Sequence, residues 1–290
     1  MKKVSIWGVL ASAFVLAACN NDVVPETTKT EFKIVSSISP LTRTPNLDES
    51  GAGHFLLGDE NTLFFHTSDK GLLHTLNYTY GSTYYWYDLN LGDVKSCTIS
   101  ACYPPVETET PQNFHWDIRQ QRAQSDFLMA APVDAYVNSS GPINLVFKHV
   151  LHKLVVELVA DNESVSDEEI QQAVISCTNL QPVAVLNLLN GTVVNATEKL
   201  ATLDAEAGKK AAFILPSQEV KDMSISVQIQ DKSYQFKLAD CIIRGEKLGR
   251  LESGQSLFLK FTVSKDSFTI TDQEILGWES QGEYEGSIRL

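Results

Sequence analysis

His149 and His152 are the two side chains whose spacing could make a metal site. Three residues apart on a helix, both imidazoles would lie on one face and could coordinate together. The surrounding segment, "INLVFKHVLHKLVVELVA", is rich in Val, Ile and Phe, which favours a strand with a bulge or helical turn near the histidines. On a strand, an offset of three sends them to opposite faces, and no third ligand is evident. Packing histidines are therefore the favoured interpretation, and no metal is expected.

Motifs that would mark an enzyme do not occur in the sequence. It contains no G-x-S-x-G nucleophile elbow, no P-loop, no dinucleotide fingerprint and no EF-hand loop. Carboxylates are plentiful, but a surplus of Asp and Glu is typical of a solvated surface. We expect neither an enzyme nor a cofactor.

The aromatic run "YYWY", residues 84 to 87, could bind a ligand by stacking. On a strand its four rings alternate between two faces, one of which belongs to the core. The other face either packs against a second layer or offers Tyr85, Trp86 and Tyr87 as a stacking platform for sugar. Packing is favoured, because Tyr78 and Tyr80 would lie across a hairpin from the run.

Cys19 ends an apolar run that follows Lys2 and Lys3. The run is shorter than the roughly 20 residues a membrane-spanning helix needs, so it indicates a signal peptide over residues 1–18. Its ending, "LAAC", resembles the lipobox of bacterial lipoproteins, in which a peptidase cuts before the cysteine and the thiol carries the lipid. We expect Cys19 to be lipidated, with residues 19–31 as a polar tether.

Charge and cysteine content exclude other classes. With 36 acidic and 23 basic residues, the net charge of −13 would repel a nucleic acid. The four remaining cysteines have no zinc-finger spacing and are expected to be buried free thiols, although export would permit disulfides. They are Cys97, Cys102, Cys177 and Cys241.

Short runs with apolar residues at every second position predict an all-β chain. In the first run, "FKIVSSI", Phe32, Ile34 and Ile38 share one face. The prolines and turn residues of "SPLTRTPNLDESGAG" then place Arg43 in an exposed loop. The other predicted strands are NTLFFHT, TLNYTY, TYYWYDL, VKSCTISACYPP, SDFLMAAPV, AVISCTNL, AVLNLL, KAAFILP, SISVQIQ, SYQFKL, SLFLKFTVS and SFTITD.

Turn signals organise these strands. Gly81-Ser82 suits a two-residue hairpin, Asn190-Gly191 is a strong hairpin signal, and Ser166 with Glu169 forms a capping box that starts one short helix. "NSSGP", residues 138–142, is the best candidate for a linker. We therefore expect two domains, 32–141 and 142–290.

The order of motifs resembles a known family. The lipobox, "LTRTP", "FLLGDENTLFF", "YYWYDLN", "CYPP", "SDFLMAAP", "LVFKHVLHKLVVEL", "FILPSQ" and "ILGW" are together similar to the fimbrillin family of Bacteroidales, the type V pilus subunits and their Mfa-like relatives. This resemblance implies two transthyretin-like β-sandwich domains in series. It also implies export as an outer membrane lipoprotein and cleavage by an arginine-specific protease in the loop after the first strand, where Arg43 matches.

The resemblance makes the chain a structural subunit of a cell-surface fimbria, as shaft, tip or anchor, that mediates adhesion. Its partners would be other fimbrial subunits in a homo- or heteropolymer, the outer membrane through the lipid, and a host or bacterial surface glycan or protein. We hypothesise that Phe32, Ile34 and Ile38 plug a groove until cleavage, after which a strand from another subunit fills it. The candidate donor strand carries Tyr284, Ile288 and Leu290. The alternative is a surface lipoprotein that does not polymerise and binds glycan through its aromatic face.

Overall fold

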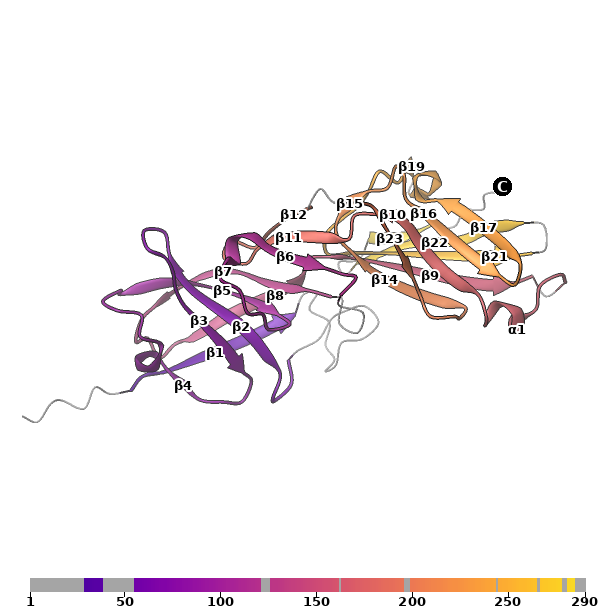
Figure 1. Ribbon diagram of the computed structural model, residues 1–290. Helices are drawn as coiled ribbons and strands as arrows, with labels where there is room; N and C mark the ends of the chain where they lie inside the picture. Colours follow the sequence, from indigo (N-terminus) through magenta and orange to yellow (C-terminus); the bar gives the residue numbers. More distant parts are fainter. Residues whose placement is uncertain are drawn as a thin grey trace, which may run out of the picture.

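The protein is elongated, with two groups of β-strands arranged end to end (Figure 1). The computed structural model describes residues 29–38, 55–120, 126–161, 163–195, 199–243, 245–264, 267–277 and 281–284. Cys19, Arg43, Ile288 and Leu290 lie outside these residues. Within the described part, no helix has the length and apolar character needed to span a membrane.

The first group is a seven-stranded sheet in the order β3-β2-β5-β7-β8-β1-β4. Strand β1, the first in the chain, runs parallel to β8 and antiparallel to β4. The bounds of these strands are β1 (Glu31–Ile38), β2 (Glu60–Thr67), β3 (Gly71–Thr79), β4 (Tyr84–Tyr85), β5 (Ser96–Tyr103), β7 (Leu128–Tyr136) and β8 (Pro142–His149).

The second group contains a five-stranded sheet, β14-β9-β21-β22-β23, and a four-stranded sheet, β13-β10-β16-β17. Between the two groups lies the three-stranded sheet β12-β11-β6 (Figure 1). The larger strands are β6 (Phe114–Asp117), β9 (His152–Ala160), β10 (Val174–Leu180), β11 (Val183–Asn187), β12 (Thr192–Asn195), β13 (Ala201–Asp204), β14 (Lys210–Leu215), β16 (Ser224–Ile229), β17 (Lys232–Lys237), β21 (Gln255–Val263), β22 (Phe268–Gly277) and β23 (Gln281–Tyr284).

Short elements complete the chain. Two strand pairs, β15-β20 and β18-β19, lie in the second group. Their bounds, with those of the helices, are β15 (Gln218–Glu219), β18 (Ile242–Ile243), β19 (Glu246–Lys247), β20 (Arg250–Leu251), η1 (Trp86–Leu89), η2 (Pro111–Asn113), α1 (Asp167–Ile170) and η3 (Leu238–Asp240).

Two hydrophobic clusters hold the groups together. The first buries one face of the seven-stranded sheet, including Phe32, Leu63, Phe65 and Leu145. The second lies among the remaining sheets, and it also takes in Trp116 and Phe127 from the first part of the chain. Removal of this apolar surface from water is the main force that keeps the sheets packed.

The expected boundary at residues 141 and 142 is wrong, because β8 belongs to the first sheet. It pairs with both β7 and β1. Its strict alternation points Ile143, Leu145 and Phe147 into the first cluster, whereas Val150 already belongs to the second. The change of core therefore falls between β8 and β9, and "NSSGP" is a turn within the first sheet.

Two turn predictions are confirmed and one is wrong. Asn187 pairs with Thr192 across the Asn190-Gly191 turn, and the capping box is present, with Ser166 Oγ accepting a 3.3 Å hydrogen bond from the Glu169 amide. Gly81-Ser82 does not join a hairpin, because β4 pairs with β1 and β3 pairs with β2. The strand expected through "YYWY" ends at Tyr85, and η1 begins at Trp86.

Candidate functional site

The strand whose apolar residues were predicted to plug a groove is β1, and it lies between β8 and β4. Six consecutive residue pairs, from Lys33 opposite Pro142 to Ile38 opposite Phe147, join β1 to β8 in parallel. On its other side, the pairs within the described residues are Glu31 with Tyr85 and Phe32 with Tyr84 of β4. We call the surface that receives β1, formed by β8, β4 and the core beneath, the β1 seat. One edge of the β1 seat is long and the other is short.

Alternation along β1 sends its large apolar side chains into this seat. Phe32, Ile34 and Ile38 are buried, while Lys33 and Val35 face outward. The three residues proposed as a plug therefore share the inner face, as period two requires. Their replacement by a strand from another subunit stays a prediction.

Aromatic rings enclose Phe32. Its ring centroid lies 5.4 Å from that of Trp86, 5.8 Å from Tyr84, 6.1 Å from Phe65 and 6.4 Å from Tyr78. Edge-to-face and tilted arrangements at these distances are favourable for aromatic pairs. The sequence analysis did not assign Tyr84 or Tyr78 to this site, although their place in the aromatic runs was a signal for it.

Polar groups fasten the middle and the start of β1. The Tyr80 hydroxyl donates a hydrogen bond to Ser36 Oγ and accepts one of 3.1 Å from Asn61 Nδ2. Burial raises the pKa of Tyr80 to about 12, so the phenol keeps its proton and remains a donor. At the start of the strand, the Trp86 amide donates to the Thr30 carbonyl at 3.0 Å. The seat therefore fixes the register of β1 by hydrogen bonds as well as by packing.

Trp86 cannot serve as the sugar platform that the sequence suggested. It is only 3% exposed, its ring packs on Phe32, and its Nε1 donates a 2.9 Å hydrogen bond to the Ser139 carbonyl. Tyr85 is half-buried, whereas Tyr87 is 61% exposed. Trp86 and Tyr87 differ in exposure because they lie in η1, where side chains do not alternate between two faces as they do in a strand. The platform of Tyr85, Trp86 and Tyr87 required a strand.

The two histidines lie where the chain passes from β8 to β9. His149 Nδ1 is 2.7 Å from Asp126 Oδ2, and His152 Nδ1 donates to the Glu252 carbonyl at 2.9 Å. Among the described residues, no group of three or more His, Cys, Asp and Glu side chains could hold a metal. The histidines thus make separate structural contacts.

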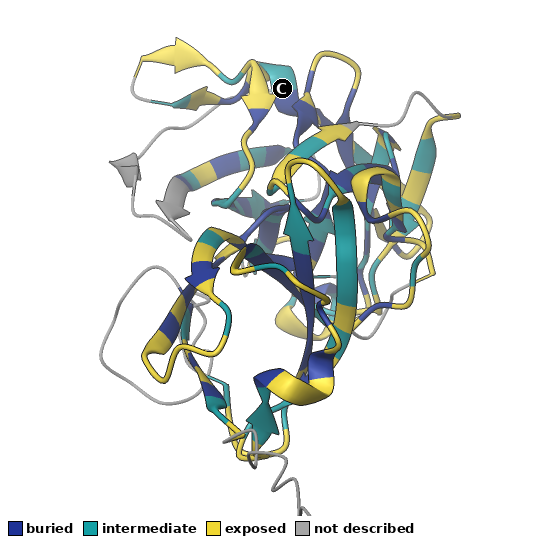
Figure 2. Ribbon diagram, turned by 90° about the vertical axis from the view of Figure 1, so that its left-hand side faces the viewer, coloured by how far each residue is buried: buried dark blue, intermediate teal, exposed yellow. Residues whose placement is uncertain are grey.

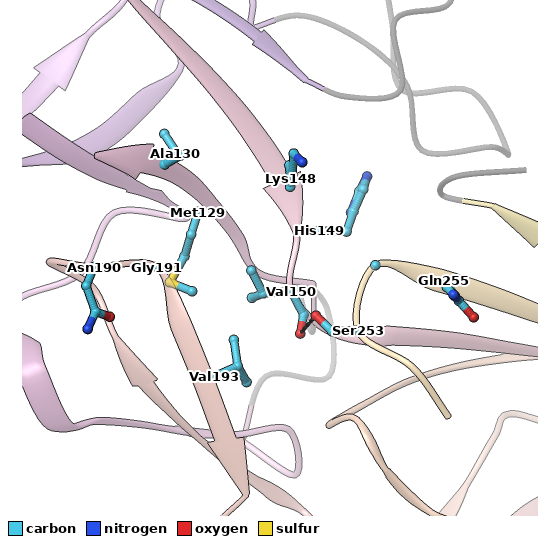
Figure 3. A pocket seen from close by; sticks show the side chains of 12 residues that line it. Met129, Ala130, Lys148, His149, Val150, Asn190, Gly191, Val193, Ser253 and Gln255 are labelled. Atoms are coloured by element: carbon cyan, nitrogen blue, oxygen red, sulfur yellow. Dashed lines mark hydrogen bonds between the residues drawn. The ribbon is translucent and has the colours of Figure 1, made fainter. Parts of the chain in front are cut away.

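A hollow of about 460 Å³ opens beside His149, between the first sheet and loops of the second group (Figure 3). Met129, Val150 and Val193 form its apolar wall, and Lys148 and Gln255 lie at its edges. The Ser253 hydroxyl at this hollow donates to the Val150 carbonyl at 2.8 Å, and the apolar side of the hollow continues into the second hydrophobic cluster. We interpret it as a packing space at the junction.

All four described cysteines are free and buried, which confirms that prediction. Burial raises the pKa of Cys97 to about 11 and those of Cys177 and Cys241 to about 12, and it raises the pKa of Cys102 further still. A thiol must lose its proton to act as a nucleophile, so these cysteines are inert packing residues.

The described part of the chain is built mainly from β-strands in several sheets, with β1 inserted near one edge of the first sheet. Residues 59–278 match the model of the fimbrillin-like family. The chain belongs to this fimbrillin-like family, whose members are structural and adhesive proteins, not enzymes.

One relative is similar to this chain in sequence, and two solved structures are similar to it in fold. Fim1C of Bacteroides uniformis, named as a candidate fimbrium subunit, is 28% identical over 143 residues, and the match covers 47% of each chain. The chain therefore spans about half the length of this curated relative. The fold resembles that of a candidate cell adhesion protein of Bacteroides uniformis, with a TM-score of 0.69, 19% identity and coverage of 86% of this chain and 99% of that one. A second candidate adhesion protein, from Bacteroides ovatus, gives a TM-score of 0.59 at 18% identity, with 88% and 99% coverage.

Proposed function

We propose that this protein is a subunit of a cell-surface fimbria that mediates adhesion and assembles by donor-strand exchange. In this proposal the chain is exported as an outer membrane lipoprotein through Cys19, and its sheets form two transthyretin-like sandwich domains in series. Cleavage near Arg43 then releases β1. The observation that carries the proposal is the β1 seat, which buries three large apolar side chains of a single strand.

Departure of β1 would leave two kinds of surface exposed. The backbone of β8 would lose six paired positions, and an unpaired strand edge is a template for another strand. The apolar surface under Phe32, Ile34 and Ile38 would also meet water, and each such side chain is worth about 1.5 to 3 kcal/mol when buried, as an upper estimate. The unpaired edge of β8 and the exposed apolar surface would both favour insertion of a strand from another subunit by β-augmentation.

The C-terminal segment is the proposed donor. Tyr284 ends β23, while Ile288 and Leu290 lie beyond the described residues. The β1 seat already holds alternate apolar residues of β1. A donor strand with the same alternation could take their place.

The test follows polymers on gels run without boiling. Arg43→Ala and deletion of residues 282–290 are each expected to abolish the ladder formed by the wild type, because one blocks release of β1 and the other removes the donor. Arg43→Lys is the matched control for charge, since it keeps the cation but should still resist an arginine-specific protease. Ladders that survive both Arg43→Ala and the deletion would contradict the proposal.

A further inference from the structure

We propose that the β4 end of the molecule carries a binding site for a neutral glycan, built on the exposed ring of Tyr87. This inference adds a receptor class to the adhesion role proposed above and rests on that role for its biological purpose. The site belongs to the single chain, so it can be measured without assembly.

A hollow of about 520 Å³ lies beside Tyr87. Two loops form it, one running from η1 to β5 and the other joining β7 to β8. Asn90 and Asp93 line it from the first loop, Asn138 lines it from the second, and Trp86 and Leu91 form its buried floor. Figure 2 looks onto this end of the molecule, where the short helical turn shows exposed residues beside buried ones.

Backbone geometry and hydrogen bonds hold the hollow open. Asn90 and Asn138 both adopt the left-handed conformation, with φ of 50° and 65°, which bends each loop around the space. Trp86 Nε1 donates to the Ser139 carbonyl at 2.9 Å, and the Val137 amide donates to the Lys95 carbonyl at 3.0 Å. These two bonds tie the separate loops to one another, so a ligand would meet a site that is already formed.

The chemistry of the lining suits a sugar. Tyr87 is 61% exposed, and Lys29 Nζ lies over one face of its ring, 5.9 Å from the centroid. The sugar would therefore stack on the opposite face of the ring. An aromatic face is electron-rich and packs well against the C–H face of a pyranose. The side-chain amides of Asn90 and Asn138 each offer donors and an acceptor to hydroxyl groups.

Charge selects a neutral glycan over an acidic one. The Lys29 ammonium at the Tyr87 ring is opposed by Asp93, which lines the hollow, and by Asp88, which is exposed in η1. The whole chain carries a net charge of −13. Sialylated or sulfated glycans would be repelled by this field, whereas a neutral sugar can donate its hydroxyls to the Asp93 carboxylate.

The test measures binding of the full chain to immobilised neutral hexasaccharides of glucose, mannose, galactose and N-acetylglucosamine, beside sialylated and sulfated glycans, by biolayer interferometry. At least one neutral glycan should bind, and Tyr87→Ala should weaken its Kd by at least about tenfold, or about 1.4 kcal/mol. Asn138→Gly keeps the left-handed backbone but removes the amide, so it should weaken binding several-fold. Tyr136→Ala is the matched control, because Tyr136 is 76% exposed but does not line this hollow.

Three results would overturn the glycan site: no neutral glycan bound, equal binding by Tyr87→Ala and wild type, or a preference for the acidic glycans. Ladder gels of the same proteins separate this inference from the assembly proposal. A chain that binds through Tyr87 but forms no ladders supports the site and contradicts assembly. A chain that forms ladders without binding any neutral glycan supports assembly and contradicts the site.

Discussion

The environment of a buried polar side chain sets its protonation, and His152 shows this effect clearly. His152 donates through Nδ1 to the Glu252 carbonyl, while its Nε2 atom is buried without a hydrogen-bond partner among the described residues. Burial lowers the pKa of His152 to about 4, because a charged imidazolium would lose its hydration there. The neutral ring is therefore part of the folded state.

This burial predicts a loss of stability in mild acid. An unfolded histidine has a pKa of about 6.5, so between pH 6.5 and about 4 the unfolded chain binds a proton that the folded chain does not. Stability is then highest above pH 6.5 and falls as the pH drops through this window, by roughly 2 to 3 kcal/mol for His152 between pH 7.5 and 4.5. Urea unfolding at the two pH values measures the difference.

The comparison that isolates His152 sets His152→Gln beside the wild type. The variant should reduce the pH dependence by about that amount, whatever its effect on stability at pH 7.5. The same pH dependence in His152→Gln and wild type would show that His152 does not carry the effect.

At the scale of elements, β1 combines a regular local pattern with an uneven environment. Its inner residues are buried, and its outer face remains open, with Val35 52% exposed. β8 supplies a long paired edge, whereas β4 supplies only two residues. The strand is therefore held mainly by its inner side chains and by β8.

Phe32→Ala should destabilise the unprocessed chain by about 3 to 5 kcal/mol, the usual cost of removing a buried phenylalanine. The variant loses ring contacts with Trp86, Tyr84, Phe65 and Tyr78 and leaves a cavity among them. Chemical denaturation provides the measurement, and Val35→Ala on the outer face is the control, with an expected cost below about 1 kcal/mol. Equal costs for the two variants would mean that the inner face does not hold β1.

At the scale of the whole molecule, the turn that precedes β21 is hydrogen-bonded to the junction between β8 and β9. Ser253 Oγ donates to the Val150 carbonyl at 2.8 Å, and the Gly254 amide donates to the Leu151 carbonyl at 2.9 Å. Strand β6 adds a second link, because it pairs with β11 although it lies before β7 in the chain. The two groups of sheets are thus interleaved as well as connected in series.

Gly254→Ala should weaken this junction. Gly254 has a φ of 72°, and a Cβ atom there would lie 3.0 Å from the His149 carbonyl oxygen. Left-handed strain of about 1 to 2 kcal/mol then adds to the cost of moving that backbone, so we expect a loss of roughly 2 to 3 kcal/mol in urea unfolding. Gly245→Ala has similar strain, with a φ of 84° but no atom within 4 Å of the added Cβ, and should cost less. If Gly254→Ala lost no more stability than Gly245→Ala, the close packing of Gly254 against the His149 carbonyl would be contradicted.

Local patterns in the sequence determined much of the secondary structure. Alternation places Phe32, Ile34 and Ile38 on one face of β1, and the pairing of Ser166 with Glu169 starts α1. These features were predictable because the forces behind them act between residues a few positions apart. The turn at Asn190-Gly191 was predictable for the same reason, since a glycine there meets the demand for positive φ.

Only the tertiary structure decided which strands and surfaces meet. The parallel pairing of β1 with β8 joins residues more than 100 positions apart, and it assigns β8 to the first sheet against the boundary expected from "NSSGP". The same packing buries Trp86 under Phe32 and leaves Tyr87 exposed, although the two are neighbours in a run of aromatic residues. Period and turn chemistry describe each strand alone, whereas burial depends on the partner that covers it, and that partner comes from a distant part of the chain.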